Sequence, residues 1–261
     1  MLDTGSAVIE ANTFDSNEGT DHAGGIAMHD ANDGSTWALS KRTIQAAVDA
    51  ASEVGGDVWV KQGDYQNSSG QFLWLRPFAT LYGGFYGNEV SRSQRNPATY
   101  VSAVKGNNNY ASFLYSGSHL VIDGCALTQG TRGMVCSGAQ PLIRGVVFTG
   151  NGPGPEGAGM FCGNRSAPVI EKCRFIGNVT TSHGGGVAFH DCNSKIVNCV
   201  FAGNTARNFD EPSAISGGGA IRTKGGTCSI INNTFVGNRS WWSAQGSPGL
   251  GGGAIFSTST S

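Results

Sequence analysis

The feature that most limits how this chain can fold is an internal repeat. Residues 168–192 (PVIEKCRFIGNVTTSHGGGVAFHDC) align without gaps on residues 7–31 (AVIEANTFDSNEGTDHAGGIAMHDA), with twelve identities in twenty-five positions. Shorter copies at 141–151, 195–204 and 229–238 share a Phe-x-Gly-Asn ending and precede a glycine cluster. Self-similarity at intervals of about 20–50 residues is typical of solenoids.

Each copy holds two short strands separated by glycine-rich turns, and strands this short cannot bury a face alone. Stacked in register at about 4.8 Å per coil, they pair every backbone group with the coils above and below. The sequence therefore predicts an all-β fold, a right-handed parallel β-helix with coils over residues 57–256. At 261 residues, such a solenoid is one domain, 1–261.

The spacing of the copies indicates where the coils differ in length. The apolar marker positions Ile122, Ile143, Ile170, Val197 and Ile231 are 21, 27, 27 and 34 residues apart. The added residues fall between the Gly-Asn pair and the glycine cluster, so one corner of each coil carries a progressively longer loop. We also expect one interior column of aromatic rings, formed by Phe148, Phe175, Phe201 and Phe235.

Residues 40–55 have apolar residues at helical spacing, with Ser40 as the expected N-cap and Gly55 as the stop. This predicts a short N-terminal capping helix over the first coil, where open strand edges would invite aggregation. A full repeat in residues 1–31 precedes this helix. Three explanations stay open: excision from a tandem array, circular permutation, or docking on another coil end. Residues 257–261 read as linker.

The runs TIQAAVDAASEVGGDVWVKQGDY and LYGGFYG, with the repeated Phe-x-Gly-Asn and Gly-Gly-Gly-Ala elements, resemble secreted bacterial β-helix proteins with polymorphic-outer-membrane-type repeats. The resemblance covers nearly the whole chain and implies an extracellular protein. It specifies the fold far more than the function, because the same scaffold carries lyases, hydrolases, adhesins and carbohydrate-binding modules.

The charge excludes two classes of partner. A net charge of -1 and a pI near 6.5 give no reason to bind nucleic acid or an anionic membrane surface. No apolar run approaches eighteen residues, so we expect no membrane span.

Seven cysteines raise the question of disulfides. The repeat alignment places Cys173 beside Cys199 and Cys136 beside Cys162, so either disulfides or a ladder of reduced, buried thiols fits. No Cys-x-x-Cys occurs, which argues against zinc, and no other metal ligand set is predicted.

The recurring His-Asp pairs, at 29–30 and 190–191, and the repeated asparagines predict hydrogen bonding at stacked turns rather than chemistry. Asp123 is assigned to the same turn ladders. The asparagines are Asn151, Asn178, Asn204 and Asn238.

The corner loops supply the candidate ligand-binding surface. Trp241 and Trp242 lie in a polar, glycine-rich insertion with no evident core to enter, so at least one indole is expected to be exposed, although one of them could instead anchor its own loop. Sugar rings stack well on flat aromatic faces. The predicted ligand-binding residues are Trp241, Trp242, Asp210, Glu211, Arg207, Phe209 and His183.

These observations favour a secreted, non-catalytic carbohydrate-binding module for a plant cell-wall polysaccharide, xylan-like or another β-glycan. The chain is similar in size and repeat style to β-helix carbohydrate-binding modules found beside xylanases, which implies a place in a larger multidomain secreted enzyme. No cofactor is predicted, with calcium alone left open.

The alternatives are a polysaccharide lyase or glycoside hydrolase, whose acid and base would be Asp210, Glu211 or Glu156, and a structural or adhesive repeat protein. The sequence lacks the Arg-x-Pro-x-x-Arg of β-helix lyases and the Asp-Asp and Gly-His-Gly pairs of polygalacturonase-like hydrolases.

Overall fold

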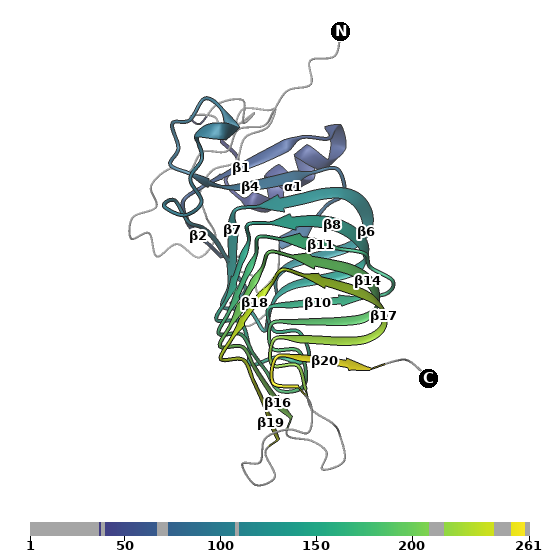
Figure 1. Ribbon diagram of the computed structural model, residues 1–261. Helices are drawn as coiled ribbons and strands as arrows, with labels where there is room; N and C mark the ends of the chain where they lie inside the picture. Colours follow the sequence, from purple (N-terminus) through teal and green to yellow (C-terminus); the bar gives the residue numbers. More distant parts are fainter. Residues whose placement is uncertain are drawn as a thin grey trace.

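The chain forms an elongated stack of parallel strands with one helix at its N-terminal end (Figure 1). The computed structural model describes residues 37, 40–66, 73–107, 110–208, 217–242 and 252–258. Within these residues the strands pair in parallel from coil to coil, which confirms the expected β-helix. None of the helices in this part of the chain has the length and apolar character needed to cross a membrane.

Three sheets form the sides of the coils. The ten-stranded sheet contains β1 (Asp57–Lys61), β3 (Leu73–Leu75), β4 (Thr80–Phe85), β6 (Tyr110–Asp123), β8 (Arg132–Arg144), β10 (Met160–Gly163), β11 (Val169–Glu171), β14 (Val187–Val197), β17 (Ile221–Ile231) and β20 (Ile255–Thr258). The seven-stranded sheet contains β2 (Gly63–Gln66), β5 (Ser102–Lys105), β7 (Cys125–Thr128), β9 (Val147–Thr149), β12 (Arg174–Ile176), β15 (Val200–Ala202) and β18 (Thr234–Val236). The three-stranded sheet contains β13 (Val179–Thr180), β16 (Thr205–Asn208) and β19 (Arg239–Trp242). From β12 onward, each coil visits all three sheets in turn.

Helix α1 (Ile44–Val54) packs over the first coil, as the amphipathic pattern predicts. Its N-cap is Thr43 rather than Ser40, because Oγ1 of Thr43 accepts a hydrogen bond from the backbone N–H of Ala46 at 3.1 Å. Gly55 ends the helix in the left-handed conformation, with φ of 74°. The residues that α1 buries against the stack are Ile44, Ala47, Val48 and Ala51.

The interior contains the predicted aromatic column. Phe148, Phe175, Phe201 and Phe235 pair in register, and their ring centroids are 4.5, 4.7 and 5.1 Å apart in that order. Such offset stacking adds to the burial of each ring. The column fixes the register of the C-terminal coils.

The repeated asparagines form a hydrogen-bonded ladder at the stacked turns, as predicted, and its bonds run between coils. Nδ2 of Asn151 donates to Oδ1 of Asn178, and Nδ2 of Asn178 donates to Oδ1 of Asn204, each at 2.9 Å. These side chains are buried and bond the neighbouring coils rather than their own backbone. The left-handed conformation is taken by the preceding glycine, as at Gly177 with φ of 62°.

One part of the predicted register is wrong by one residue. Ile170 pairs with Ile196 and Ile196 pairs with Ile230, so Val197 and Ile231 are not the marker positions. The corrected spacings are 196 − 170 = 26 and 230 − 196 = 34 residues. In a strand, a shift of one residue turns the side chain to the opposite face, and Ile231 is indeed 48% exposed.

Several predictions concern residues outside the described part. The repeat at 1–31, the loop residues Phe209, Asp210 and Glu211, and the chain beyond Thr258 all lie there. Strand β20 includes Ser257 and Thr258, so the coils run two residues into the segment expected to be linker.

Candidate functional site

The corner loops of successive coils bring two of the predicted site residues together. Glu156 lies in the loop between β9 and β10, and His183 lies in the loop between β13 and β14. The N–H of Gly157 donates to the carbonyl of His183 at 3.1 Å, which aligns the two loops. Gly157 has φ of 69°, and a Cβ at this position would lie 2.3 Å from the carbonyl oxygen of Met160, so the turn after Glu156 requires glycine.

Glu156 contacts three side chains, and together Glu156, His183, His190 and Arg222 are named the Glu156 cluster. Nη1 of Arg222 lies 3.3 Å from Oε1 of Glu156, and Nε2 of His183 lies 3.9 Å from the same oxygen. Nε2 of His190, on β14, contacts Oε2. One carboxylate therefore joins groups from three successive coils.

The cluster is largely withdrawn from solvent, with exposed side-chain fractions of 9% for Arg222, 12% for His183, 18% for Glu156 and 29% for His190. Burial alone would raise the pKa of Glu156, but the contact with His190 and the nearby positive groups outweigh it and lower that pKa. Burial, and then the charge of Arg222, lower the pKa of His183. At neutral pH Glu156 is therefore ionised and His183 is neutral.

Aromatic and basic side chains surround the cluster on the outer face of the ten-stranded sheet. The ring of Phe161 meets His190 edge-on at 5.2 Å, and the guanidinium of Arg132 lies 4.6 Å above the Phe161 ring. Nε of Arg132 also donates to the backbone carbonyl of Glu156 at 2.7 Å. Lys224 is exposed and pairs in register with His190. The surroundings of the single carboxylate are therefore strongly basic.

This arrangement can hold or pass a proton. A carboxylate in contact with an imidazole is a common acid–base pair. Glycoside hydrolysis ordinarily needs two carboxylates, and Glu156 is the only one that the described residues bring into the cluster. The described residues contain no group of three or more potential ligands with metal-binding geometry. The fixed charge of Arg222 also opposes a cation at this carboxylate.

The second candidate surface is the outer face of the three-stranded sheet. Trp241 on β19 is 41% exposed and pairs in register with Arg207 on β16, whose side chain is also exposed. The preceding residues of the two strands, Ser240 and Ala206, face inward, so alternation along each strand turns Trp241 and Arg207 outward. Trp242 ends β19, and its side chain lies outside the described part.

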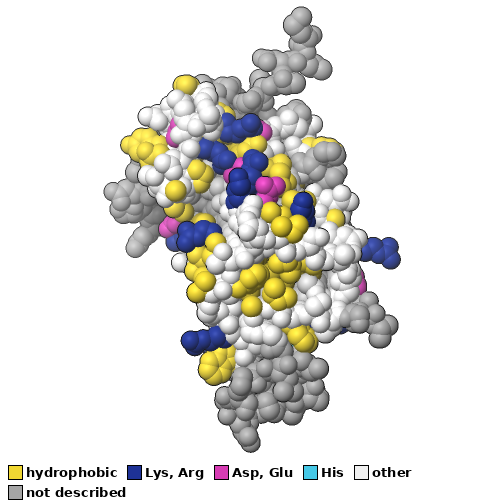
Figure 2. All heavy atoms as spheres, viewed as in Figure 1, with side chains coloured by type: hydrophobic (Ala, Val, Ile, Leu, Met, Phe, Trp, Pro, Cys, Tyr) yellow, Lys and Arg dark blue, Asp and Glu magenta, His cyan; other side chains and the backbone are white. Residues whose placement is uncertain are grey.

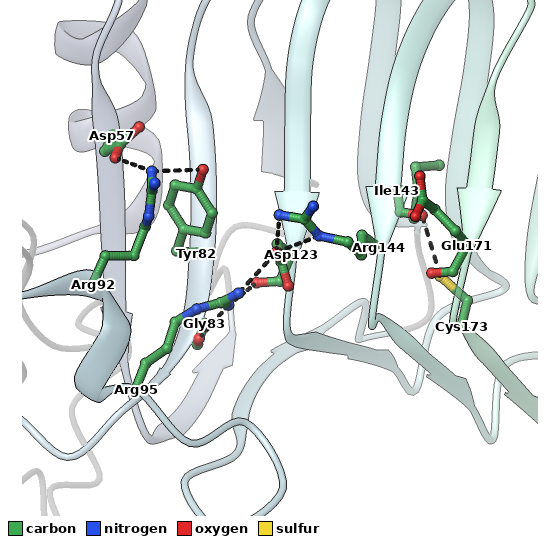
Figure 3. Close-up of polar contacts among 10 residues, drawn as sticks. All are labelled: Asp57, Tyr82, Gly83, Arg92, Arg95, Asp123, Ile143, Arg144, Glu171 and Cys173. Carbon is green, nitrogen blue, oxygen red and sulfur yellow. Dashed lines mark hydrogen bonds and ion pairs between the residues drawn. The ribbon is translucent and has the colours of Figure 1, made fainter.

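Asp123 belongs to an ion network and not to a turn ladder, which corrects the sequence-based assignment (Figure 3). Its carboxylate is 6% exposed, and its Oδ2 lies 2.8 Å from Nη2 of Arg95 and 2.7 Å from Nη2 of Arg144. Figure 2 shows acidic and basic side chains gathered on this face of the first coils, with apolar side chains beside them. Because two arginines from different parts of the chain contact the same buried carboxylate oxygen, the network serves to join coils.

Sequence reasoning missed half of the Glu156 cluster. The recurrence of the His-Asp pair at 29–30 and 190–191 predicts only turn hydrogen bonding for His190, and Arg222 is not among the predicted site residues. The available signal was alternation: residues two apart on the strands after each glycine cluster, such as Arg222 and Lys224, share the outer face.

The family model for the right-handed beta helix region matches residues 90–261, about two thirds of the chain. No curated protein and no solved structure matches the chain. Because the family match covers most of the sequence and the described strands stack in parallel coils, the chain belongs to the right-handed β-helix family.

Proposed function

We propose that the protein is an extracellular module that binds a plant cell-wall polysaccharide, such as xylan or another β-glycan, on the outer face of the three-stranded sheet. The observation that supports this most directly is the exposed indole of Trp241. An indole on the outer face of a short strand contributes little to the packing of the core. It does offer a flat apolar surface on which a sugar ring can stack.

The residues around Trp241 suit a neutral, hydroxyl-rich ligand. Arg207 lies opposite Trp241 in the preceding coil, and Arg239 is exposed two residues before Trp241 on the same strand. Both guanidinium groups carry several N–H donors that can reach sugar hydroxyls while the ring stacks on the indole. Arg239 pairs with Thr205 and Arg207 pairs with Trp241, so the two arginines lie diagonally across neighbouring strands, one on each strand.

The setting of this module is part of the proposal. By analogy with the β-helix modules that occur beside xylanases, the protein is secreted and works within a larger multidomain enzyme. Calcium is not required by any residue used in this argument.

A second candidate function is cleavage of the polysaccharide, and the contact between Glu156 and His190 favours it. In that case Glu156 and His190 form the acid–base pair, and Arg222 fixes the ionised state of Glu156. Binding is preferred, because no second carboxylate within the described residues joins the cluster.

Affinity electrophoresis and isothermal titration against xylan and glucan oligomers test the proposal. Trp241→Ala should lower affinity by about thirtyfold, on the order of 2 kcal/mol, with an unchanged melting temperature. Trp74→Ala is the matched control, since Trp74 is 38% exposed at the helix-capped end of the stack. Equal binding by the parent and Trp241→Ala would reject this surface.

Reducing-sugar and unsaturated-product assays on the same polysaccharides separate binding from cleavage. Retention without product supports a binding module. Product formation that Glu156→Gln abolishes, with affinity preserved, would instead establish the enzyme.

A further inference from the structure

The outer face of the ten-stranded sheet carries a lysine and a histidine side by side. Lys224 on β17 pairs in register with His190 on β14, so the two residues stand one strand spacing, about 4.8 Å, apart. The residues just before them, Phe189 and Thr223, are buried, so alternation turns His190 and Lys224 outward. Strands β10, β14 and β17 are neighbours in this sheet (Figure 1).

Both side chains keep a polar group that no described residue engages. Lys224 is exposed and forms no ion pair within the described part of the chain. Nε2 of His190 contacts Oε2 of Glu156, whereas Nδ1 of His190 has no hydrogen-bond partner among the described residues. A neutral imidazole that donates through Nε2 accepts at Nδ1, and an ammonium group only donates. A carboxylate and a hydroxyl about one strand spacing apart on the same ligand would satisfy both groups.

The surface beside His190 lacks a side chain in the preceding coil. Cys162 pairs with Phe189, which places Gly163 next to His190. A Cβ on Gly163 would meet only the ring of Phe161 within 4 Å, at 3.2 Å. Phe161 is half-buried, and its ring meets that of His190 edge-on. His190 is therefore bordered by a cation on one side and by an apolar ring on the other.

The charges beneath this surface favour an anion. The side chain of Arg222, two residues before Lys224 on the same strand, is 9% exposed, and its Nε is buried without a hydrogen-bond partner among the described residues. Arg132 adds a second guanidinium against the ring of Phe161. Within the described part of the chain, Glu156 is the only carboxylate in contact with the cluster, so positive charge is in excess.

We propose that the outer surface formed by Lys224, His190 and Phe161 is a binding site for an acidic sugar, with the carboxylate on Lys224 and a neighbouring hydroxyl on His190. A uronate unit carries both groups on one ring, and its apolar C–H groups can lie against the aromatic edge. The pairing of carboxylate and ammonium gives a charge-assisted hydrogen bond. This site is on a different sheet from Trp241 and is additional to the sugar surface proposed above.

Binding at this surface should take up protons at His183. Burial and the charge of Arg222 lower the pKa of His183. His190 and Lys224 act in the same direction, and Glu156 opposes them. A carboxylate bound at Lys224 offsets this repulsion, so the pKa of His183 rises toward its ordinary value in the complex. Affinity should therefore increase as the pH falls from 7 to 6.

Isothermal titration with a galacturonate trisaccharide tests the site, and the carboxyl-reduced trisaccharide is the matched ligand. The parent should bind the uronate about tenfold more tightly than the reduced sugar, and added salt should weaken this preference. Lys224→Gln should abolish the preference. Lys195→Gln, at an exposed lysine farther along β14, is the control and should behave as the parent. Trp241→Ala should bind the uronate as the parent does, which separates this site from the surface on the three-stranded sheet.

Titration at pH 6 in two buffers of different ionisation enthalpy measures the protons taken up. The parent should take up protons on binding the uronate, and His183→Gln should take up fewer. Equal affinity for the two trisaccharides, an unchanged preference in Lys224→Gln, or binding without proton uptake would overturn the proposal. Loss of uronate binding in Trp241→Ala would place the acidic sugar on the three-stranded sheet and would also overturn it. Inorganic phosphate that competes as strongly as the uronate would overturn it by showing a site for any small anion.

Discussion

Nη1 of Arg222 lies 3.3 Å from Oε1 of Glu156, although the two residues are 66 positions apart in the sequence. The distance is short because Arg222 belongs to the second coil after that of Glu156, and each coil adds only one strand spacing. The pair therefore holds the corner loop of one coil against the outer face of the strands that follow.

Replacing Glu156 with Gln should lower the free energy of unfolding by about 2 kcal/mol, because it leaves the buried guanidinium of Arg222 without its counter-charge. Chemical denaturation at pH 7 measures the effect. Glu53→Gln, at an exposed position on α1, is the control and should change stability by less than about 0.5 kcal/mol. Equal midpoints for the two variants would show that the pair contributes nothing to stability.

Stability should decline on acidification, and His183 should account for part of the decline. The pKa of His183 is lowered below its ordinary value of 6.5 by burial and by Arg222, with His190 and Lys224 acting in the same direction and Glu156 opposing. In the unfolded chain His183 therefore binds a proton near pH 6.5, whereas in the folded chain it binds a proton only at lower pH. The free energy of unfolding therefore falls as the pH drops below 6.5.

His183→Gln removes this titration and should flatten the slope between pH 7 and pH 5 in urea denaturation. The lowered pKa of Glu156 adds a second loss below pH 4.5, which His183→Gln leaves in place. If the pH dependence of stability between pH 7 and pH 5 were the same in His183→Gln as in the parent, the burial of this imidazole would not be the cause of the decline.

All seven cysteines are free thiols, which decides between the two expectations for the neighbouring pairs. Burial raises the pKa of the Cys192 thiol to about 11, so this thiol carries little reactive thiolate at neutral pH. In a thiol titration without reductant, the native protein should react slowly and first at Cys228. After denaturation seven thiols should titrate. A count of five would reveal one disulfide, with Cys136–Cys162 or Cys173–Cys199 as the first pair to examine.

The fold could be predicted because its signal is periodic. Each Phe-x-Gly-Asn element marks a ring of the aromatic column, a left-handed glycine and a ladder asparagine. Phe175 follows Ile170 by five positions, just as Phe201 follows Ile196. The marker error at Val197 arose from choosing an apolar residue by type, when the distance to the following phenylalanine gives the register.

The candidate site was harder to predict, because its contacts depend on the exact length of the intervening coils. Glu156 and His183 stood out as polar residues in the lengthening corner loops. His190 lies on a strand, and its role depends on which loop residue folds back over it. Neither the alternation of side chains along the strand nor the repeat pattern predicts that contact. Asp123 shows the same limit, since its partner Arg95 comes from a connection between strands with no repeat of its own.

Two truncations in the aromatic column should differ according to position. Phe175→Ala removes a fully buried ring that stacks on Phe148 at 4.5 Å and on Phe201 at 4.7 Å, so it should lower the free energy of unfolding by about 3–5 kcal/mol. Phe235→Ala removes a half-buried ring with one stacking neighbour and should cost about 1–2 kcal/mol. Both are measured by urea denaturation at pH 7. If the two variants lost equal stability, the ring of Phe235 would be as well packed as that of Phe175, against the difference in their burial.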